Sequence, residues 1–518
     1  MIRSTWACLC LSSALVLSAC GGSNHDKDPS GSAPPERGTL LHSPPPRVAS
    51  LSAADLAAAF GADPETQTML QLTGAPKCRV DVQYIEYNTI GAKNEATTAS
   101  GALMVPAGID PACQGARPVV LYAHGTTTDR NYNIASVQPS SGQRNSEGLL
   151  IALAFVSQGY IVVAPNYAGY DTSTLTYHPY LVAEQSANEM MDALKAARSA
   201  LPTKDAPITT AGSKLFITGY SQGGHVAMAT HRAMQAAGIT VTASAPMSGP
   251  YALSAFGDAE FYGQVSGGAP VFATLLTNSY QHAYGNVYSQ PSDLFESAYA
   301  STIENLLPST TSRSDLYAQG KLPSDQLFDS TPPDPAYAAY TPATEPAASA
   351  PLFARGFGPN HLVTNSYRLA YLQDAQANPD GAFPTFTNGA PPASPQQPLR
   401  QDLKTNDLRN WTPTAPMLLC GGDQDPTVYF MNTQIMQAYW APTAAPITVL
   451  DVDANSTGND DPYKSIKDAF DVAKQLVAAT AVAQGATDGG ASKVLSDYHA
   501  GLVAPFCLTA TRGFFDAH

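Results

Sequence analysis

The segment Leu215-Phe-Ile-Thr-Gly-Tyr-Ser-Gln-Gly-Gly-His225 decides the fold, because it combines a strand, a tight turn and the start of a helix. Its first four residues form a mostly apolar run, and a helical pattern follows. Ser221 stands between them in a Gly-x-Ser-x-Gly arrangement, which is typical of a strained strand-to-helix turn. Gly219 and Gly223 lack Cβ atoms and leave room for this turn. We therefore expect the Ser221 hydroxyl at the carboxyl end of a sheet, beside the amino end of a helix.

The same alternation of strand and helix patterns continues on both sides of this segment. The predicted strands are Val80–Tyr87, Gly101–Val105, Val119–Tyr122, Tyr160–Ala164, Leu215–Thr218, Val241–Ala245, Met417–Cys420 and Ile447–Leu450. The predicted helices are Glu147–Ser157, Ala183–Ala200, Gly223–Ala237, Tyr463–Val482 and Val503–Phe515. The first two strands form an antiparallel pair at a sheet edge, whereas the later, continuously apolar runs are typical of buried parallel strands. The sequence therefore predicts an α/β fold, with a mostly parallel sheet covered by helices on both faces.

Residues 251–404 interrupt this alternation. They contain helical patterns, such as Ser292–Leu307 and His361–Asp374, between proline-rich stretches. We interpret this segment as a large, mainly helical cap inserted into a core whose two parts are residues 49–250 and 405–518. The beginning of the cap is rich in aromatic side chains, which either pack in its interior or line a substrate site. These are Tyr251, Phe256, Phe261, Tyr262, Phe272, Tyr280 and Tyr284.

The serine needs a base, because a serine hydroxyl is a weak nucleophile unless a histidine oriented by a carboxylate removes its proton. Where the serine stands on such a turn, the carboxylate and then the histidine follow later in the chain. Beyond the helix that follows Ser221, His282 and His361 fall in the cap and His518 is the terminal residue. His499 is therefore the predicted base.

The acid is expected just after a late strand, where the chain reads Gly421-Gly-Asp-Gln-Asp-Pro-Thr-Val428. Asp425 is preferred, because it stands where the loop turns toward the next helix. Asp423 is the alternative, and it otherwise stabilises the turn. The acid would accept the Nδ1 proton of His499 and fix its tautomer.

An oxyanion requires two backbone donors near the serine. One is the N–H of Gln222, directly after Ser221. The other is expected from the loop that follows the strand Val119–Tyr122, where Thr126 N–H is the best candidate and Gly125 leaves space for an acyl group. His124 in the same loop either supports it or is simply a packed polar residue.

These pieces together resemble the α/β-hydrolases, and most closely the secretory lipase family with its bacterial relatives. The resemblance lies in Tyr122-Ala-His-Gly-Thr-Thr127, Val162-Val-Ala-Pro-Asn-Tyr-Ala-Gly169, Gly219-Tyr-Ser-Gln-Gly-Gly-His225 and the loops around Asp425 and His499. It covers roughly residues 50–250 and 413–518 and is weak across the cap. One departure is the long stretch between residues 452 and 498, where a short loop is commoner. An ordered stretch here would help to shape the site.

The resemblance implies a serine hydrolase that cleaves carboxylic esters through an acyl-enzyme, without a cofactor. The aromatic cap favours a hydrophobic acyl or aromatic group, so the expected substrate is a small-molecule or lipid ester. A peptidase or amidase using the same three side chains is the alternative within enzymes. A catalytically silent binding protein displayed at the cell surface is the alternative from another class.

The N-terminus carries a targeting signal. Residues 1–19 contain Arg3 and a short apolar run, which is typical of a signal peptide and too short to span a bilayer. The sequence Leu17-Ser-Ala-Cys20 resembles the lipobox of bacterial lipoproteins, which implies cleavage before Cys20 and its modification by fatty acyl groups such as palmitate. Plain secretion with cleavage elsewhere is the alternative. The next residue is a glycine and not an acid, which favours the outer membrane by the same resemblance. Residues 20–48 are expected to be a lipidated cysteine and a flexible tether.

Four cysteines remain for the folded part of an exported chain: Cys78, Cys113, Cys420 and Cys507. Disulfides are expected in an oxidising compartment. Three pairings are possible, and we favour Cys78–Cys113 with Cys420–Cys507, because each pair lies near one end of the catalytic domain. Four buried thiols remain an alternative, whereas the lack of a Cys-x-x-Cys spacing after Cys20 argues against zinc.

Composition excludes other classes. The 518 residues carry 27 Lys+Arg against 42 Asp+Glu, for a net charge of −15, which argues against a nucleic-acid partner. No phosphate-binding loop or dinucleotide fingerprint is present. Asp451-Val-Asp-Ala-Asn455 begins like a calcium loop, but Ser456 and Pro462 stand where an EF-hand needs Gly and Glu, so we predict no such metal site. The oligomeric state does not follow from the sequence.

Overall fold

The computed structural model describes residues 35–61, 70–138, 145–202 and 208–518. The predicted signal peptide, Cys20 and the first part of the tether lie outside the described residues. From Glu36 to His518 the chain forms one compact unit.

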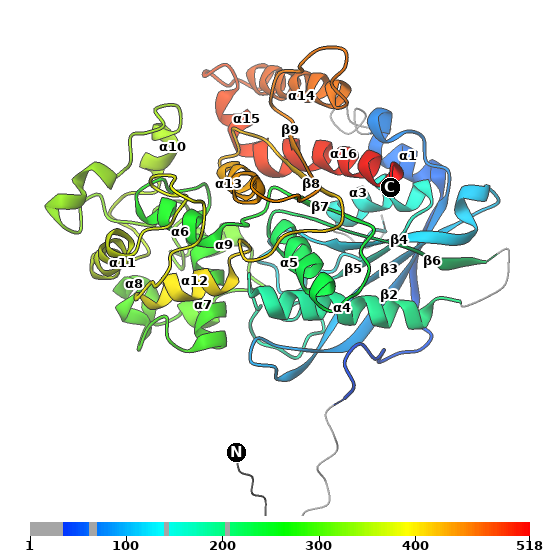
Figure 1. The fold of residues 1–518 in the computed structure, drawn as a ribbon, viewed down its shortest axis with the longest axis horizontal. Coiled ribbons are helices and arrows are strands. Elements are labelled where there is room, and N and C mark those ends of the chain that lie inside the picture. The colour runs from blue at the N-terminus through cyan, green and yellow to red at the C-terminus, as the bar shows by residue number, and fades with distance from the viewer. Residues whose placement is uncertain (1–34, 62–69, 139–144, 203–207) are drawn as a thin grey trace, which may run out of the picture. The chain divides into compact units, whose positions relative to one another are not determined.

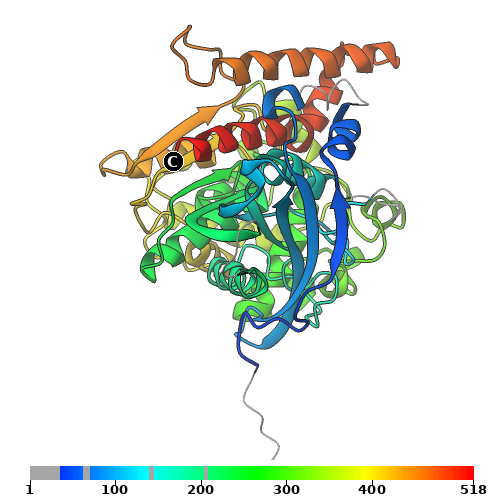
Figure 2. The ribbon, with the colours of Figure 1, turned by 90° about the vertical axis from the view of Figure 1, so that its right-hand side faces the viewer.

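A nine-stranded sheet lies at the centre of this unit (Figures 1 and 2), in the order β1-β2-β3-β5-β4-β6-β7-β8-β9. The strands are β1 (Arg47–Leu51), β2 (Arg79–Ile90), β3 (Ala96–Ala107), β4 (Gly115–Ala123), β5 (Ile161–Pro165), β6 (Thr209–Tyr220), β7 (Ala243–Met247), β8 (Met417–Gly421) and β9 (Ile447–Asp451). The pairs from β1 to β5 along the order are antiparallel, and all pairs from β5 to β9 are parallel. The predicted α/β fold with a mostly parallel sheet is confirmed.

Helices cover both faces of the sheet, as Figure 1 shows. The core helices are α1 (Ala53–Gly61), α3 (Ser146–Ala154), α4 (Ala183–Ala200), α5 (Gln222–Ala236), α13 (Met431–Trp440), α14 (Lys464–Ala483), α15 (Ala491–Asp497) and α16 (Ala504–Asp516). Side chains of β4 alternate between the faces, as a strand requires. Val119 and Leu121 pack with α4 and α5, whereas Val120 and Tyr122 pack with α3 and α16. The carboxyl ends of the parallel strands are thereby fixed between two helical layers.

The cap lies between β7 and β8. Its helices are α6 (Leu253–Phe261), α7 (Ala269–Tyr284), α8 (Ser297–Ala300), α9 (Arg313–Ala318), α10 (Ala350–Arg355), α11 (Asn365–Ala377) and α12 (Pro398–Asn406). Short 3₁₀ turns occur at Pro111–Cys113, Val156–Gln158, Pro291–Asp293, Ile303–Asn305 and Pro335–Tyr340. The helical pattern over Ser292–Leu307 forms only in short pieces: α8 and the two 3₁₀ turns Pro291–Asp293 and Ile303–Asn305. Ser301 and Thr302, which are weak helix formers, follow α8 at the interruption.

The strand at the antiparallel edge is β1, which the sequence analysis did not predict. The expected edge pair, β2 and β3, is antiparallel, but β1 pairs with the outer side of β2 and is itself the edge strand. Residues 36–48, assigned to the flexible tether, are largely held against this edge. Leu40 pairs with Tyr87 of β2, and Arg37 forms an ion pair with Asp192 of α4 at 3.0 Å. This part of the expected tether therefore belongs to the folded unit.

Two buried arginines join segments that are far apart in sequence, one within the cap and one between the cap and the start of the second part of the core. Arg400 of α12 contacts Asp258 of α6 at 2.8 Å. Arg409 bridges Asp407 and Asp380, at 2.8 Å and 2.7 Å, with all three side chains inaccessible to solvent. Desolvation makes such charges costly unless they are paired, so these contacts specify one arrangement of the cap segments.

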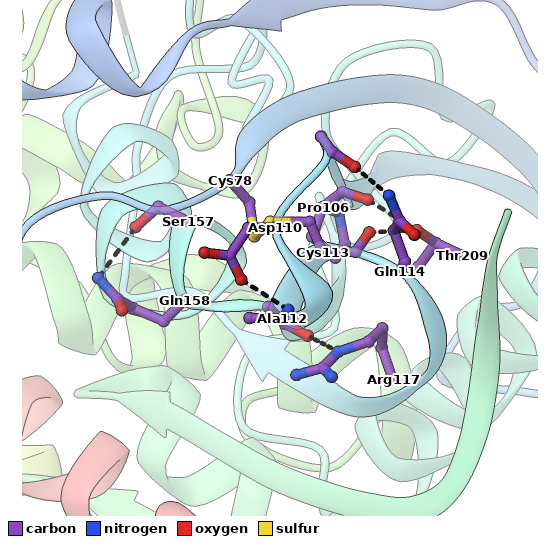
Figure 3. Close-up of a disulfide and its surroundings, with 12 residues drawn as sticks. Cys78, Pro106, Asp110, Ala112, Cys113, Gln114, Arg117, Ser157, Gln158 and Thr209 are labelled. Atoms are coloured by element: carbon purple, nitrogen blue, oxygen red, sulfur yellow. Dashed lines mark hydrogen bonds between the residues drawn. A yellow bond between two sulfur atoms is a disulfide. The ribbon is translucent and has the colours of Figure 1, made fainter. Parts of the chain in front are cut away.

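Two disulfides form, and both match the favoured pairing. Cys78–Cys113 joins the start of β2 to the turn before β4, beside the first residue of β6. There the Thr209 hydroxyl lies 2.9 Å from the carbonyl oxygen of Cys113 (Figure 3). Cys420–Cys507 joins β8 to α16. This second disulfide joins the strand that precedes Asp425 to the helix that follows His499.

We expect loss of the Cys420–Cys507 disulfide to be the more costly of the two. Its cysteines are separated by 87 residues, against 35 for Cys78–Cys113, and a longer closed loop removes more entropy from the unfolded chain. The double variant Cys420→Ala, Cys507→Ala should lower the free energy of unfolding by about 2–5 kcal/mol. Urea unfolding without reductant measures this, with Cys78→Ala, Cys113→Ala as the matched control. An equal or larger loss in the control would contradict the loop-entropy argument.

Candidate active site

Ser221 lies at the junction of β6 and α5 in a strained backbone conformation. Its φ and ψ are 60° and −121°, in a region that residues with a Cβ atom rarely occupy. A Cβ on Gly219 would lie 2.3 Å from the carbonyl oxygen of Gly223, and one on Gly223 would lie 2.0 Å from that of Ala123. The two glycines are therefore required sterically, because any side chain would force β4, β6 and α5 apart.

His499 lies on a π-helical turn, Tyr498–Val503, between α15 and α16. Its Nδ1 is 2.7 Å from Oδ2 of Asp425, which is buried in the loop after β8. Oδ1 of Asp425 accepts the backbone N–H groups of Thr427 and Val428 at 2.9 Å and 3.0 Å. The carboxylate is thus fixed on one side by its own loop and faces the imidazole on the other.

Asp423, the alternative acid, lies elsewhere. Its side chain is exposed and accepts a hydrogen bond from Gln424 Nε2 at 2.8 Å. Its backbone N–H donates to Asp451. Of the two candidates, Asp425 is the one that contacts His499.

Ser221 and His499 line one cavity of about 940 Å³. Within the described residues, neither Ser221 Oγ nor the buried Nε2 of His499 has a hydrogen-bond partner. The Tyr220 hydroxyl donates to the backbone carbonyl of His499 and so holds the turn that carries the imidazole. The Asp425 contact orients Nδ1, which leaves Nε2 available to a reacting group.

The predicted oxyanion loop follows β4. In the described part of the chain, the N–H groups of Gln222 and Thr126 donate no hydrogen bond, so both are available to a ligand. Gly125 N–H donates to Oε1 of Glu147 at 3.1 Å, and the Thr126 hydroxyl lies 2.9 Å from that of Tyr180. A Cβ on Gly125 would meet the protein only at ordinary distances, beginning with 3.5 Å to the Tyr220 carbonyl oxygen. Packing alone therefore does not require glycine there.

His124 lies behind this loop and does not line the cavity that Ser221 and His499 line. Its ring nitrogens are 2.7 Å and 3.1 Å from the carbonyl oxygens of Gly125 and Asn166, and its ring stacks on Tyr167. Burial lowers the pKa of His124 below its ordinary value. These contacts make His124 a structural support of the loop.

Two further residues, Glu147 and His178, support the site and were not predicted from the sequence. Glu147, near the start of α3, accepts the Gly125 N–H and the Tyr122 hydroxyl. His178 lies 2.6 Å from the side-chain Nε2 of Gln222 and 3.0 Å, through Nδ1, from the carbonyl oxygen of Ala168. Burial lowers the pKa of His178 to about 3, so the neutral ring accepts the Gln222 amide. No motif marks either residue, although an acidic residue in a first helical turn is a weak signal for Glu147.

A second, apolar cavity of about 120 Å³ also reaches Ser221. It lies among α6, α7 and α12 of the cap. Of the aromatic residues at the start of the cap, Phe256, Phe261 and Phe272 line it, whereas Tyr251, Tyr262 and Tyr280 are buried without lining it and Tyr284 is partly exposed. Both interpretations of the aromatic cluster therefore apply, each to some of its members.

The two cavities differ in their walls. The larger one carries charged and polar side chains from the cap, including Arg313, Asp325 and Arg355. Ser492 and Ser496 of α15 complete its wall. The long stretch after β9, which Figure 2 shows as α14 and the segment leading into α16, is therefore ordered and shapes the site.

Comparisons with known proteins agree with this fold. The chain has the α/β-hydrolase fold, and residues 138–239 match the secretory lipase (LIP) family model, so the resemblance to that family is confirmed. A ligand-bound form of the rice cell wall degrading esterase LipA from Xanthomonas oryzae is 26% identical, with a TM-score of 0.64 over 92% of this chain and 98% of LipA. Another LipA structure is 28% identical, with a TM-score of 0.60 over 84% of this chain and 95% of LipA.

A protein from Legionella pneumophila shares the fold at 21% identity, with a TM-score of 0.57 over 80% of this chain and 91% of its own. No curated protein matches the sequence. Within the described residues, no cluster of His, Cys, Asp or Glu could hold a metal ion. No helix in that part of the chain is long and apolar enough to cross a bilayer.

Replacing Asp425 is expected to slow the reaction of Ser221 far more than replacing Asp423. Asp425→Asn keeps the shape but offers no carboxylate to the imidazole, and the comparable change in a serine protease costs about 10⁴-fold. The measurement is the rate at which a fluorophosphonate probe labels Ser221 in the folded protein. Asp423→Asn is the matched control and should label at the wild-type rate. Equal rates for the two variants would remove Asp425 from the site.

Proposed function

We propose that this protein hydrolyses carboxylic esters through an acyl-enzyme formed on Ser221. The observation that carries the proposal is the His499–Asp425 hydrogen bond of 2.7 Å, together with a His499 Nε2 that has no hydrogen-bond partner among the described residues and a cavity that both Ser221 and His499 line. The similarity to the secretory lipase family and to the esterase LipA supports ester cleavage as the reaction.

The chemistry proceeds in two halves. Ser221 Oγ attacks the ester carbonyl as His499 Nε2 takes its proton, and the protonated imidazole then gives that proton to the departing alcohol. Water, activated by the same nitrogen, attacks the acyl-serine, and the acid leaves with Ser221 restored. The N–H groups of Gln222 and Thr126 would stabilise the oxyanion of each tetrahedral intermediate, and Asp425 would stabilise the imidazolium.

The two cavities suggest where each half of the ester binds. The apolar cavity lies within the cap and is lined by side chains such as Phe256, Phe272 and Leu276, so it suits a hydrophobic acyl or aromatic group. The larger cavity carries polar walls and would take the alcohol and the attacking water.

Ester hydrolysis should depend entirely on Ser221. Purified wild-type protein is expected to cleave p-nitrophenyl esters, with kcat/KM rising from acetate to longer acyl chains as the apolar cavity fills. Ser221→Ala removes the nucleophile and should abolish this activity, while its unfolding transition stays unchanged.

Peptide anilides and p-nitroanilides of the same acyl groups provide the comparison between reactions. Slower cleavage of the amides than of the esters supports the proposal. Faster amide cleavage would assign a peptidase or amidase instead, and full ester activity in Ser221→Ala would refute the mechanism.

The likeness to secretory lipases and the two disulfides indicate export. We further propose that Cys20, which lies outside the described residues, is lipidated and holds the enzyme at the bacterial outer membrane. The support is the Leu17-Ser-Ala-Cys20 sequence and the position of Glu36, the first residue of the folded unit, only a short tether beyond it.

Changing Cys20 should release the enzyme from membranes. In a bacterial host that processes lipoproteins, the wild-type protein should incorporate labelled palmitate and sediment with outer membranes. Cys20→Ser should incorporate none and appear in the soluble periplasmic fraction, with its esterase activity intact. Palmitate labelling that persists in Cys20→Ser would contradict the proposed anchor.

A further inference from the structure

A single carboxyl group lies in the wall of the apolar cavity that reaches Ser221. Glu260, near the end of α6, is the one Asp, Glu, Lys or Arg among the described residues that line this cavity. Its neighbours along the wall include Phe256, Phe261 and Leu403. An acidic side chain in such surroundings is costly and calls for a partner, because the apolar wall offers it no compensation.

The protein satisfies this carboxyl only in part. Its donors come from one residue, Ser266: the backbone N–H lies 3.2 Å and 3.1 Å from the two Glu260 oxygens, and the Ser266 hydroxyl is a second donor. No lysine, arginine or histidine forms an ion pair with Glu260 in the described part of the chain. Since a carboxylate has about four acceptor positions, capacity remains for a donor supplied by a ligand in the cavity.

The electrostatic surroundings of Glu260 agree with this remaining hydrogen-bonding capacity. Burial raises the pKa of Glu260 to about 7, although the hydrogen bonds from Ser266 favour the ionised form. The titratable group that faces Glu260 from another segment is the Tyr429 hydroxyl, which donates to the Gln264 carbonyl at 3.0 Å and so is not free to bind the carboxyl.

We infer that Glu260 makes the acyl cavity selective for an acyl group that carries a hydroxyl on an otherwise apolar body. This inference rests on the proposed ester hydrolysis, because it places the acyl group in this cavity. A hydroxyl can donate to the carboxylate, and the remainder of the group buries itself against phenylalanine and leucine side chains. A cationic amine would also bind a carboxylate, but it would lose far more hydration on entering an apolar cavity than a hydroxyl does.

Three matched series of p-nitrophenyl esters test this selectivity. The acyl chains end in a methyl, a hydroxyl or a methoxy group, at graded chain lengths. The wild-type enzyme should prefer the hydroxyl over the methoxy ester by at least about tenfold in kcat/KM at the best length, the scale of one hydrogen bond to a charged acceptor. The methoxy group accepts but cannot donate, so it cannot bind a carboxylate.

Glu260→Gln is the decisive variant. Its amide oxygen can still accept the Ser266 N–H, while its NH₂ group faces the cavity as a donor. The hydroxyl and the methoxy oxygen can both accept from that donor, so the preference between them should be lost. Phe256→Leu, on the same helix and in the same cavity, is the control: it should change the best chain length but keep the preference for hydroxyl.

The pH dependence gives a second readout. Above pH 7 the Glu260 carboxyl is ionised and only accepts, whereas below pH 7 it is protonated and also donates. The hydroxyl-to-methoxy ratio should therefore rise with pH through about 7 in the wild type and stay flat in Glu260→Gln. A pH effect on steps that both substrates share cancels in the ratio.

The outcomes separate this inference from the proposed function. Ser221-dependent hydrolysis of all three series without a preference for hydroxyl, or with one that Glu260→Gln retains, overturns the role of Glu260 and leaves ester hydrolysis intact. A stronger preference for an amino-terminated chain overturns the hydroxyl assignment. No hydrolysis of any series refutes the proposed function itself. Fluorophosphonate labelling of Ser221 in each variant verifies that the site is folded.

Discussion

The close approach of β4, β6 and α5 around Ser221 is the constraint on which the rest of the site depends. A backbone at φ 60° and ψ −121° is unfavourable by about 1–3 kcal/mol, and it persists only where the surrounding structure fixes it. Here the fixing comes from Gly219 and Gly223, whose missing Cβ atoms let α5 lie directly against the end of β4. The turn presents the serine hydroxyl and the first free N–H of the helix to the same point. The strained backbone thus fixes the position of the proposed nucleophile, Ser221, and of the proposed oxyanion donor, the Gln222 N–H.

The remaining groups reach that point because parallel strands end at one edge of the sheet. The loop after β8 carries Asp425, and the turn before α16 carries His499. The Cys420–Cys507 disulfide joins these two elements, so the carboxylate and the imidazole are tethered on both sides of their hydrogen bond. The Tyr220 hydroxyl adds a third connection, from the residue before the nucleophile to the backbone of the base. These core contacts fix the hydrogen-bonded pair, and the cap adds one more through the Gly267 N–H, which donates to the Pro426 carbonyl at 2.8 Å.

Much of this arrangement could be predicted, because it depends on local patterns and chain order. The glycine spacing identifies Ser221, and elimination along the chain leaves His499. Both lie in the same cavity wall. The choice of Asp425 over Asp423 needed only the direction of the loop. What could not be predicted depends on long-range packing. Glu147 contacts Gly125, and His178 contacts Gln222. The partners are far apart in the sequence, and no periodicity or motif indicates that they lie together. The edge strand β1 was missed for a related reason: it is short and follows a proline-rich stretch, and its pairing with β2 stabilises it more than its own composition does.

In the cap, too, the sequence pattern left part of the assignment open. Its aromatic residues were open to two interpretations, since a phenylalanine that lines a cavity and one that fills a core have the same sequence pattern. The structure shows which of these aromatic residues line the apolar cavity, and it places the Glu260 side chain beside them in the cavity wall. A carboxyl group there cannot assist proton transfer at Ser221 as Asp425 can, because it has no contact with His499 among the described residues. It can only discriminate among groups that enter the apolar space. Under the proposed function, the core would determine which bond is broken, and a single charged side chain in the cap would determine which acyl group is accepted. For this reason substitutions in the cap should change substrate preference without changing the reaction.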